Sequence, residues 1–161
     1  SAHQRGYNVA VIDPNTGQVE DTDRFDTWEN IGEGYRLADY LKGVARGKIV
    51  AATINDEGSG AIHGHAKAAL RKVGVNRFPG PWWSHAFIGV KGTAAGSAIQ
   101  AFGEHAAAVI GVLGENIPGE IAGDRTRLEA LLRESAAVAP AKIAVFIPKL
   151  DQGATITVVY R

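Results

Sequence analysis

Apolar and polar residues alternate along several short stretches of the chain, and this period of two predicts β-strands. The first stretch leads into an Asp-Pro-Asn-Thr-Gly turn, so the segment after it should return antiparallel as a hairpin. The two stretches nearest the C-terminus are the clearest strands and are joined by a linker of hairpin length. The predicted strands cover residues 7–12, 18–21, 24–28, 48–54, 85–90, 106–113, 142–147 and 154–160.

Three other stretches repeat their apolar residues with the period of a helix. Residues 33–44 carry leucines and a valine at i, i+4 and i+7, which predicts an amphipathic helix. A second helix is predicted to end near Val73, and Gly74 follows where a left-handed C-cap residue would stand. A third is predicted over residues 124–138, starting at an N-capping aspartate.

Residues 48–73 form the most informative stretch, because an apolar strand there leads through an acidic turn into a helix. The turn reads Asn-Asp-Glu-Gly-Ser-Gly, and nothing close in sequence is basic enough to neutralise both carboxylates. Side chains held at the edge of a rigid strand are well placed to bind a ligand. We therefore predict that Asn55, Asp56 and Glu57 supply the polar groups of a site. The alternative is that Asp56 caps the following helix.

A tryptophan pair stands on a proline-stiffened loop at residues 76–84. Trp82 and Trp83 form either a lid over the core or an exposed platform, and we expect at least one of the two rings to be buried. The large rings of Phe25 and Trp28 are expected in the core.

The composition is that of an ordinary globular domain, with 45% hydrophobic and 21% charged residues. Lysine plus arginine equals aspartate plus glutamate at 17 each, so net charge gives no support to nucleic-acid or anionic-membrane binding. No apolar run approaches the roughly 20 residues of a membrane-spanning helix. There is no cysteine and hence no disulfide framework.

The start of the chain is typical of a fragment, since it lacks methionine and begins Ser-Ala-His like a tag remnant. We expect a larger protein with an attached membrane or catalytic domain. Within the fragment, residues 1–161 are predicted to form a single compact domain.

Several short motifs follow one another in an order that resembles the interleukin-like EMT inducer family, also called PANDER-like. Within that family, the chain resembles the stem domain of protein O-mannose N-acetylglucosaminyltransferase most. No single motif is specific for this family, but the occurrence of all of them in this order over residues 5–92 is. The matching residues are Arg5, Gly6, Asn8, Val9, Gly17, Phe25, Asp26, Thr27, Asp56, Glu57, Gly58, Ser59, Ala66, Lys67, Ala68, Leu70, Arg71, Gly74, Ala86, Phe87, Ile88, Gly89, Lys91 and Gly92.

The resemblance implies an α+β fold, with two twisted and mainly antiparallel sheets packed as a sandwich with flanking helices. It assigns residues 5–100 to the family domain and leaves residues 101–161 as a C-terminal β-α-β-β extension. It further implies an extracellular, periplasmic or lumenal location and, for the stem domain, noncatalytic sugar binding. The other role known in the family is cytokine-like signalling.

Two departures from the family pattern limit what the resemblance implies. Animal members carry disulfide cysteines, whereas the stability of this chain must come from its core. The stem domain has an arginine and an aspartate before the last matching strand, where this chain reads Pro-Trp-Trp-Ser. A sugar contact made by that arginine therefore does not carry over, although the acidic turn does.

The function that this pattern favours is a noncatalytic carbohydrate-binding module. Carboxylates and amides accept hydrogen bonds from vicinal hydroxyls, and an indole face covers the C–H surface of a sugar. Asn55, Asp56 and Glu57 would bind hydroxyls while Trp82 or Trp83 stacks. A glycan containing N-acetylglucosamine or mannose is the predicted ligand. The alternative is a protein-interaction or assembly module without sugar binding, in which the tryptophans meet another chain.

Catalysis is the weaker prediction. Glycoside hydrolysis needs two carboxylates about 5–9 Å apart, and Asp26 with Asp56 or Glu57 is the pairing the chain offers. Ser59 lacks the spacing of a nucleophile elbow, and neither a phosphate-binding loop nor a dinucleotide fingerprint is present. We expect no cofactor and no enzyme activity in this part of the protein.

Metal binding has two weak cues. His63 and His65 stand two apart, with His85 and His105 elsewhere, and residues two apart on a helix point away from each other. A calcium site at the acidic turn is the second possibility. Neither cue is enough to predict a metal.

Overall fold

Two antiparallel sheets and two helices make up the computed structural model of the chain, which describes residues 5–15 and 18–103 together with four later strands. The five-stranded sheet has the order β2-β1-β3-β4-β5, so β3 lies at its centre. Its elements, with the two helices, are β1 (Gly6–Ile12), β2 (Val19–Phe25), α1 (Ile31–Gly43), β3 (Ile49–Asn55), α2 (Gly64–Arg71), β4 (Ser84–Val90) and β5 (Ile99–Gly103).

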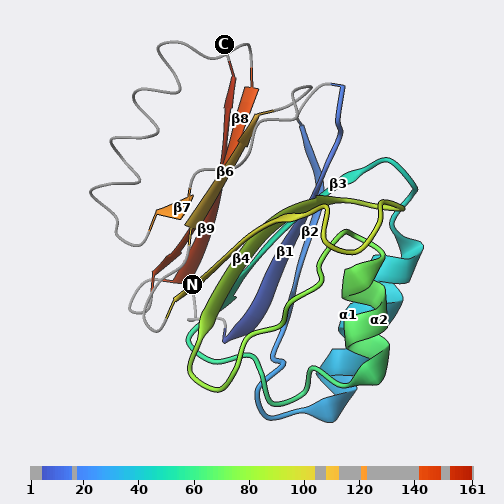
Figure 1. Cartoon of the computed structure of the whole chain (residues 1–161), viewed down its shortest axis with the longest axis vertical. Coiled ribbons are helices and arrows are strands. Elements are labelled where there is room, and N and C mark those ends of the chain that lie inside the picture. The colour runs from blue at the N-terminus through green and yellow to red at the C-terminus, as the bar shows by residue number, and fades with distance from the viewer. Residues whose placement is uncertain are drawn as a thin grey trace.

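The four-stranded sheet has the order β7-β6-β8-β9. Its strands are β6 (Ala108–Val112), β7 (Ile121–Ala122), β8 (Lys142–Lys149) and β9 (Gly153–Tyr160). The predicted C-terminal pair is confirmed as an antiparallel hairpin. In Figure 1 this sheet lies on the side of the five-stranded sheet opposite to the helices, and β6 and β8 approach β3 and β4. The predicted helix at 124–138 lies outside the described residues.

The main core lies between the five-stranded sheet and the helices. Strand side chains alternate between two faces, so every second residue points at α1 and α2. Leu37 and Leu41 of α1 and Leu70 of α2 meet this face, as their helical spacing predicts. The sheet residues of this core are Tyr7, Val9, Phe25, Val50, Ala52, Ile54 and Phe87.

The opposite face of the same sheet is also buried, and its central positions are mostly small. Ala10, Ala51, Ala86 and Ala101 are each at most 2% exposed, with Ile12 and Ile49 beside them. Short side chains allow another layer of backbone to approach closely.

Both helices begin and end as their sequences indicate. Asn30 caps α1 by accepting a hydrogen bond from the Gly32 amide at 2.9 Å. After α2 the chain turns through Gly74, whose φ is +93°. The Val75 amide donates to the Leu70 carbonyl at 3.2 Å and the Gly74 amide to the Arg71 carbonyl at 3.1 Å. This is a Schellman motif, so the predicted left-handed residue is confirmed.

Two local predictions were wrong. Residues 18–21 and 24–28 are not separate strands, because β2 runs unbroken to Phe25 and Trp28 lies in the turn that follows. Strand β5 was missed, since its glycine-rich approach looks like a linker. It nevertheless pairs with β4 and forms one edge of the sheet. At the other edge, β2 is exposed and rich in charge, which discourages pairing with another chain.

Candidate functional site

Glu57 is buried, only 1% exposed, and its carboxylate accepts three backbone hydrogen bonds. Oε1 accepts from the amides of Gly58 at 2.8 Å and Ser59 at 2.7 Å. Oε2 accepts from the amide of Trp82, on a loop 25 residues further along the chain. Backbone donors therefore already use most of the acceptor positions of this buried carboxylate, and the prediction that Glu57 binds ligand hydroxyls stays a prediction. Through the hydrogen bond from the Trp82 amide, Glu57 connects the tryptophan loop to the acidic turn.

The loop that Glu57 holds presents an exposed indole. Trp82 is 64% exposed and has a φ of +64°, a backbone conformation that costs a bulky residue energy. The hydrogen bond from its amide to a buried carboxylate offsets that cost. The expectation that one ring of the tryptophan pair is core was wrong, since Trp83 is also 41% exposed.

Trp28 lies against Trp82, with the ring centroids 5.6 Å apart and the planes inclined by 43°. The sequence interpretation placed Trp28 in the core, but it is half-buried in a turn. The spacing of Phe25 and Trp28 in the sequence already indicated that the two rings do not pack in the same core. Phe25 and Trp28 stand three apart, so in an alternating strand they point to opposite faces and cannot share one core. The site residue missed from sequence is thus Trp28.

Close backbone contacts hold the Trp28 turn against the acidic turn. The amide of Ala61 donates to the Thr27 carbonyl at 2.7 Å. A Cβ at Gly60 would lie 2.1 Å from the carbonyl oxygen of Trp28, so only glycine fits there. The two indoles therefore stand on segments whose relative positions are set by hydrogen bonds and close packing.

Asp26 secures the same turn from the other side. The Arg5 guanidinium donates to both carboxylate oxygens of Asp26, at 2.9 and 2.7 Å, and to Glu29 at 2.7 Å. This bidentate pair, above all its hydrogen bonds, lowers the pKa of Asp26. The amide of Trp28 donates to the same carboxylate at 3.4 Å.

Asp56 is the exposed carboxylate of the site. Its φ of +60° is tolerated by aspartate, and no described residue forms a hydrogen bond or ion pair with its side chain. The alternative that Asp56 caps the following helix was wrong, because α2 begins at Gly64 and its N-cap is His63. The side chain of Asn55 lies outside the described part of the structure.

Glycoside hydrolysis needs a carboxylic acid that can donate a proton, and neither Asp26 nor Glu57 is suited to that role. Asp26 is held ionised by Arg5, which opposes the raised pKa that a general acid needs. Glu57 is committed to amides. The geometry therefore suits binding better than proton transfer.

The His63 and His65 pair forms an aromatic cluster with Tyr35. The ring of Tyr35 lies 4.1 Å from that of His63 and 5.2 Å from that of His65. His63 Nδ1 accepts from the His65 amide at 3.2 Å and so caps the start of α2. His85 is buried elsewhere and His105 lies outside the described residues. Among the described residues, no three metal-binding side chains come together.

In the part of the chain that the structure describes, neither helix has the length and apolar character needed to cross a bilayer.

The described part of the chain is an α+β scaffold that brings two indoles together beside a turn with an exposed carboxylate. The chain belongs to the interleukin-like EMT inducer family, whose model matches residues 5–93, more than half of the chain. The resemblance seen in the sequence is thereby confirmed at the level of the family. The comparisons do not single out the stem domain of the N-acetylglucosaminyltransferase.

The similar proteins are much larger. The human cell migration-inducing and hyaluronan-binding protein is 40% identical over 95 residues, which cover 58% of this chain and 7% of that protein. The mouse protein of the same name matches equally. Human cell surface hyaluronidase CEMIP2 is 38% identical over 58 residues, or 36% of this chain and 4% of its own length. The chain thus spans a small fraction of these relatives.

Proposed function

We propose that this chain is a noncatalytic carbohydrate-binding domain that serves as an accessory part of a larger glycan-acting protein. The observation that carries the proposal is the exposed indole of Trp82. Its ring lies against that of Trp28, and its amide is hydrogen-bonded to the buried Glu57, so the ring is held in place without being part of the core. Proteins bind sugars through an aromatic platform and a few fixed polar groups. Asp56 supplies an acceptor for sugar hydroxyls on the turn next to Glu57.

The relatives support a glycan as the ligand class. One is named a hyaluronan-binding protein and another a cell surface hyaluronidase. For the site at Trp82 we propose an uncharged sugar, with N-acetylglucosamine and mannose as the leading candidates. Asp56 and the nearby Asp26 and Glu29 would repel a uronate carboxylate, whereas neutral hydroxyls donate well to carboxylates.

An extracellular or cell-surface location follows from the same proposal. The relatives' names place them in cell migration and at the cell surface. Their much greater length is consistent with this domain serving alongside others that carry catalysis or anchoring.

We also propose that the two sheets pack face to face as a sandwich. The small residues on the face of the five-stranded sheet away from the helices are buried, and β6 and β8 approach β3 and β4.

The test is titration of the protein with chitotetraose and with mannotetraose, followed by NMR. A single exposed stacking site should bind with a Kd of about millimolar to micromolar. Trp82→Ala and Trp28→Ala should each weaken binding by about tenfold, because each removes one ring of the platform. Asp56→Asn should weaken it by a few-fold.

Trp83→Ala is the matched control, since Trp83 is an exposed indole on the same loop that makes no ring contact with Trp28. It should leave the Kd unchanged within about twofold. Equal losses in Trp82→Ala and Trp83→Ala would remove the platform from the proposal. If no sugar shifts any resonance and the protein self-associates by sedimentation, the domain is an assembly module instead.

A further inference from the structure

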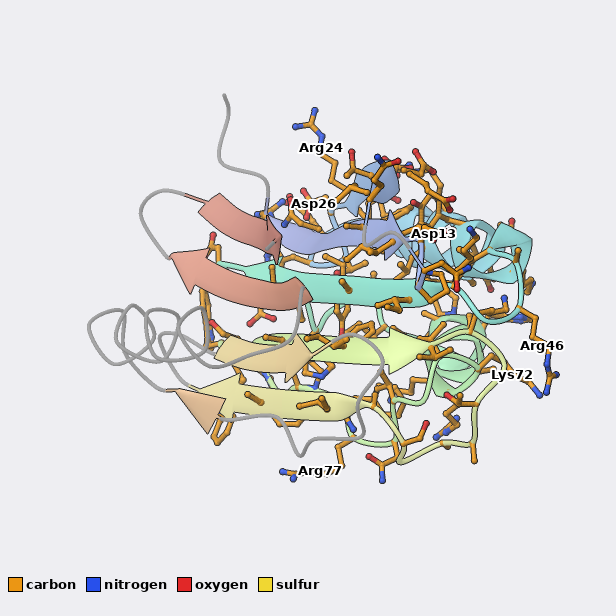
Figure 2. The ribbon with its side chains drawn as sticks, turned by 90° about the horizontal axis from the view of Figure 1, so that it is seen from above. Asp13, Arg24, Asp26, Arg46, Lys72 and Arg77 are labelled. Atoms are coloured by element: carbon orange, nitrogen blue, oxygen red, sulfur yellow. The ribbon has the colours of Figure 1, made fainter. Side chains whose placement is uncertain are left out.

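The net charge of zero conceals a strong separation of charge along the chain. Every aspartate and glutamate among the described residues lies between Asp13 and Glu57. Residues 58–103 carry no acid at all but contain five lysines and arginines. The fold keeps these groups apart: Asp26 and Arg77 lie at opposite edges of the five-stranded sheet (Figure 2).

A row of cations follows α2 and the loop after it, with Arg46 beside its C-terminal end. We call this surface the basic strip, and among the described residues none of its cations forms an ion pair with a carboxylate. Lys91 is not counted, because it donates to the carbonyls that end α1. The basic strip consists of Arg46, Lys67, Arg71, Lys72 and Arg77.

Contacts through Gly92 and Phe78 connect cations that belong to different segments of the chain. Gly92 joins two of them, since its amide donates to the Lys72 carbonyl at 2.7 Å and its Cα faces the side chain of Arg46. Figure 2 shows Arg46 and Lys72 together at the right-hand end of the molecule and Arg77 at its lower edge. Lys67 and Arg71, one helical turn apart on α2, both lie over the ring of Phe78.

Aromatic rings hold the cations of the strip in place before any ligand arrives. The Arg71 Cζ lies 5.1 Å and the Lys67 Nζ 5.6 Å from the Phe78 ring centre. The Arg77 Cζ lies 4.8 Å from the ring centre of Phe102. Cation–π contacts of this kind restrict long side chains while leaving their N–H donors free.

We propose that the basic strip binds an anionic polysaccharide, whose carboxylates or sulfates pair with the row of cations. This inference rests on the proposed function only in taking a glycan as the ligand class, and it concerns a surface separate from the Trp82 site. Guanidinium groups recognise carboxylates and sulfates through paired N–H donors. Unpaired cations also raise the local concentration of a polyanion before contact.

The rings beside the strip argue against a nucleic acid. Proteins that bind single strands stack bases on open aromatic faces. One face of Phe102 is covered by Arg77 and the other by His85, whose ring is parallel at 4.4 Å. Phe78 is covered by Lys67 and Arg71. The strip therefore offers charge without a stacking platform, which suits a polymer of charged sugars.

The experiment titrates the whole chain with a hyaluronan octasaccharide, a sulfated heparin octasaccharide and a single-stranded DNA of equal charge. Binding is measured at 20 mM and at 150 mM salt. Either glycan should bind at low salt and weaken at high salt as the Debye length shortens from roughly 20 Å to 8 Å. Binding of hyaluronan, whose charges are carboxylates alone, would show that carboxylates suffice, whereas binding of the heparin fragment alone would show that sulfates are required.

Arg71→Gln and Arg77→Gln should each weaken glycan binding by about two- to fivefold, and the double variant by the product. Arg24→Gln is the matched control: it removes an exposed arginine on β2 and changes net charge equally, away from the strip. It should change Kd by less than twofold. Thermal unfolding should show that all four variants are folded.

Three results would overturn the inference: no glycan binding at 20 mM salt, an Arg24→Gln loss equal to that of Arg71→Gln, or tighter binding of DNA than of both glycans. Trp82→Ala should leave binding of the anionic glycans intact. The two proposals are therefore tested independently. A protein that does not bind neutral sugars can still bind anionic glycans at the basic strip, and the reverse also holds.

Discussion

Glu57 shows that a carboxylate in a polar turn is not necessarily available to a ligand. Its neighbour Asp56 has the same chemistry and a nearly identical sequence context, yet one side chain is buried on three amides and the other is exposed. The difference arises because the Trp82 loop, remote in sequence, closes over one residue only. Glu57 thereby becomes the link between the turn and the indole.

Glu57→Gln should destabilise the domain and weaken sugar binding together. The amide nitrogen that replaces one oxygen cannot accept from a backbone N–H, so at least one buried donor loses its partner. The expected loss is about 1–3 kcal/mol in the free energy of unfolding, measured by urea denaturation.

Asp56→Asn is the control for that substitution, since it makes the same chemical change at the exposed neighbour. It should leave stability unchanged within about 0.5 kcal/mol. Equal stability of Glu57→Gln and the unmodified protein would show that the three amides find other acceptors.

His85 is a second buried polar residue, and it belongs to a hydrogen-bonded chain. Tyr7 donates to Nδ1 across 2.7 Å, Nε2 lies 3.3 Å from the Gln100 carbonyl oxygen, and Gln100 donates to Asn76 at 2.7 Å. Both ring nitrogens are satisfied by a neutral imidazole with its proton on Nε2. Burial lowers the pKa of His85 to about 3.

Stability should therefore fall on mild acidification. Below a pKa of about 6.5 the unfolded chain binds a proton at His85, and the folded chain does not until about pH 3. Between pH 7 and pH 5 the free energy of unfolding should drop by about 2 kcal/mol from this residue. His85→Gln, which keeps hydrogen-bonding atoms without titrating, should show a flatter dependence; parallel curves would contradict the assignment.

Glycines decide how closely the loops of the site pack. Gly60 meets the Trp28 carbonyl and Gly34 of α1 meets the Ala61 carbonyl, each with room for no Cβ. These contacts draw α1, the acidic turn and the Trp28 turn into one unit. The positions of the indoles thus depend also on α1, which contains no residue of the proposed site.

Gly60→Ala should force the Trp28 turn away from the acidic turn. A Cβ 2.1 Å from a carbonyl oxygen cannot be accommodated without backbone movement, so we expect a loss of about 1–3 kcal/mol and weaker sugar binding. Unfolding by urea and the chitotetraose titration measure the two effects.

Gly64→Ala is the matched substitution, because a Cβ there meets nothing within 4 Å at the start of α2. It should be neutral or slightly stabilising through its higher helix propensity. Similar losses for both glycine variants would mean that chain flexibility, and not the contact with Trp28, is what matters.

The proposed sandwich makes a prediction for the whole molecule. A chain ending at Gly103 would lose the second sheet and expose the face that carries Ile12, Ile49 and the alanines. It should bind a hydrophobic dye more strongly and unfold at a lower urea concentration than the 161-residue chain. Equal dye binding by both chains would show that this face is covered by something other than the later strands.

The arrangement of charge also belongs to the whole molecule. The sequence contains 17 acidic and 17 basic residues, and a net charge of zero argues against binding of a polyanion. That argument holds only when acidic and basic side chains are evenly distributed over the surface. Here the strand order places β2 with its acids at one edge of the sheet, whereas β4, β5 and the loop after α2, which carry no acid, lie toward the other. The proposed basic strip follows from this separation.

Local pattern alone was enough to predict most of the elements of this protein. Strand alternation and helical spacing predicted both helices and strands β1, β3, β4, β6, β8 and β9, because each depends on residues near in sequence. The left-handed turn at Gly74 and the family were also predictable, since both reside in short motifs.

Only the tertiary structure decided which polar and aromatic residues face solvent. Contacts between segments about 25 residues or more apart tie the Glu57 carboxylate to the Trp82 amide and place the Trp28 ring against that of Trp82. The edge strand β5 depends on pairing with β4 more than on its own glycine-rich context. Burial and hydrogen-bond partners are set by long-range packing, which no local spacing records.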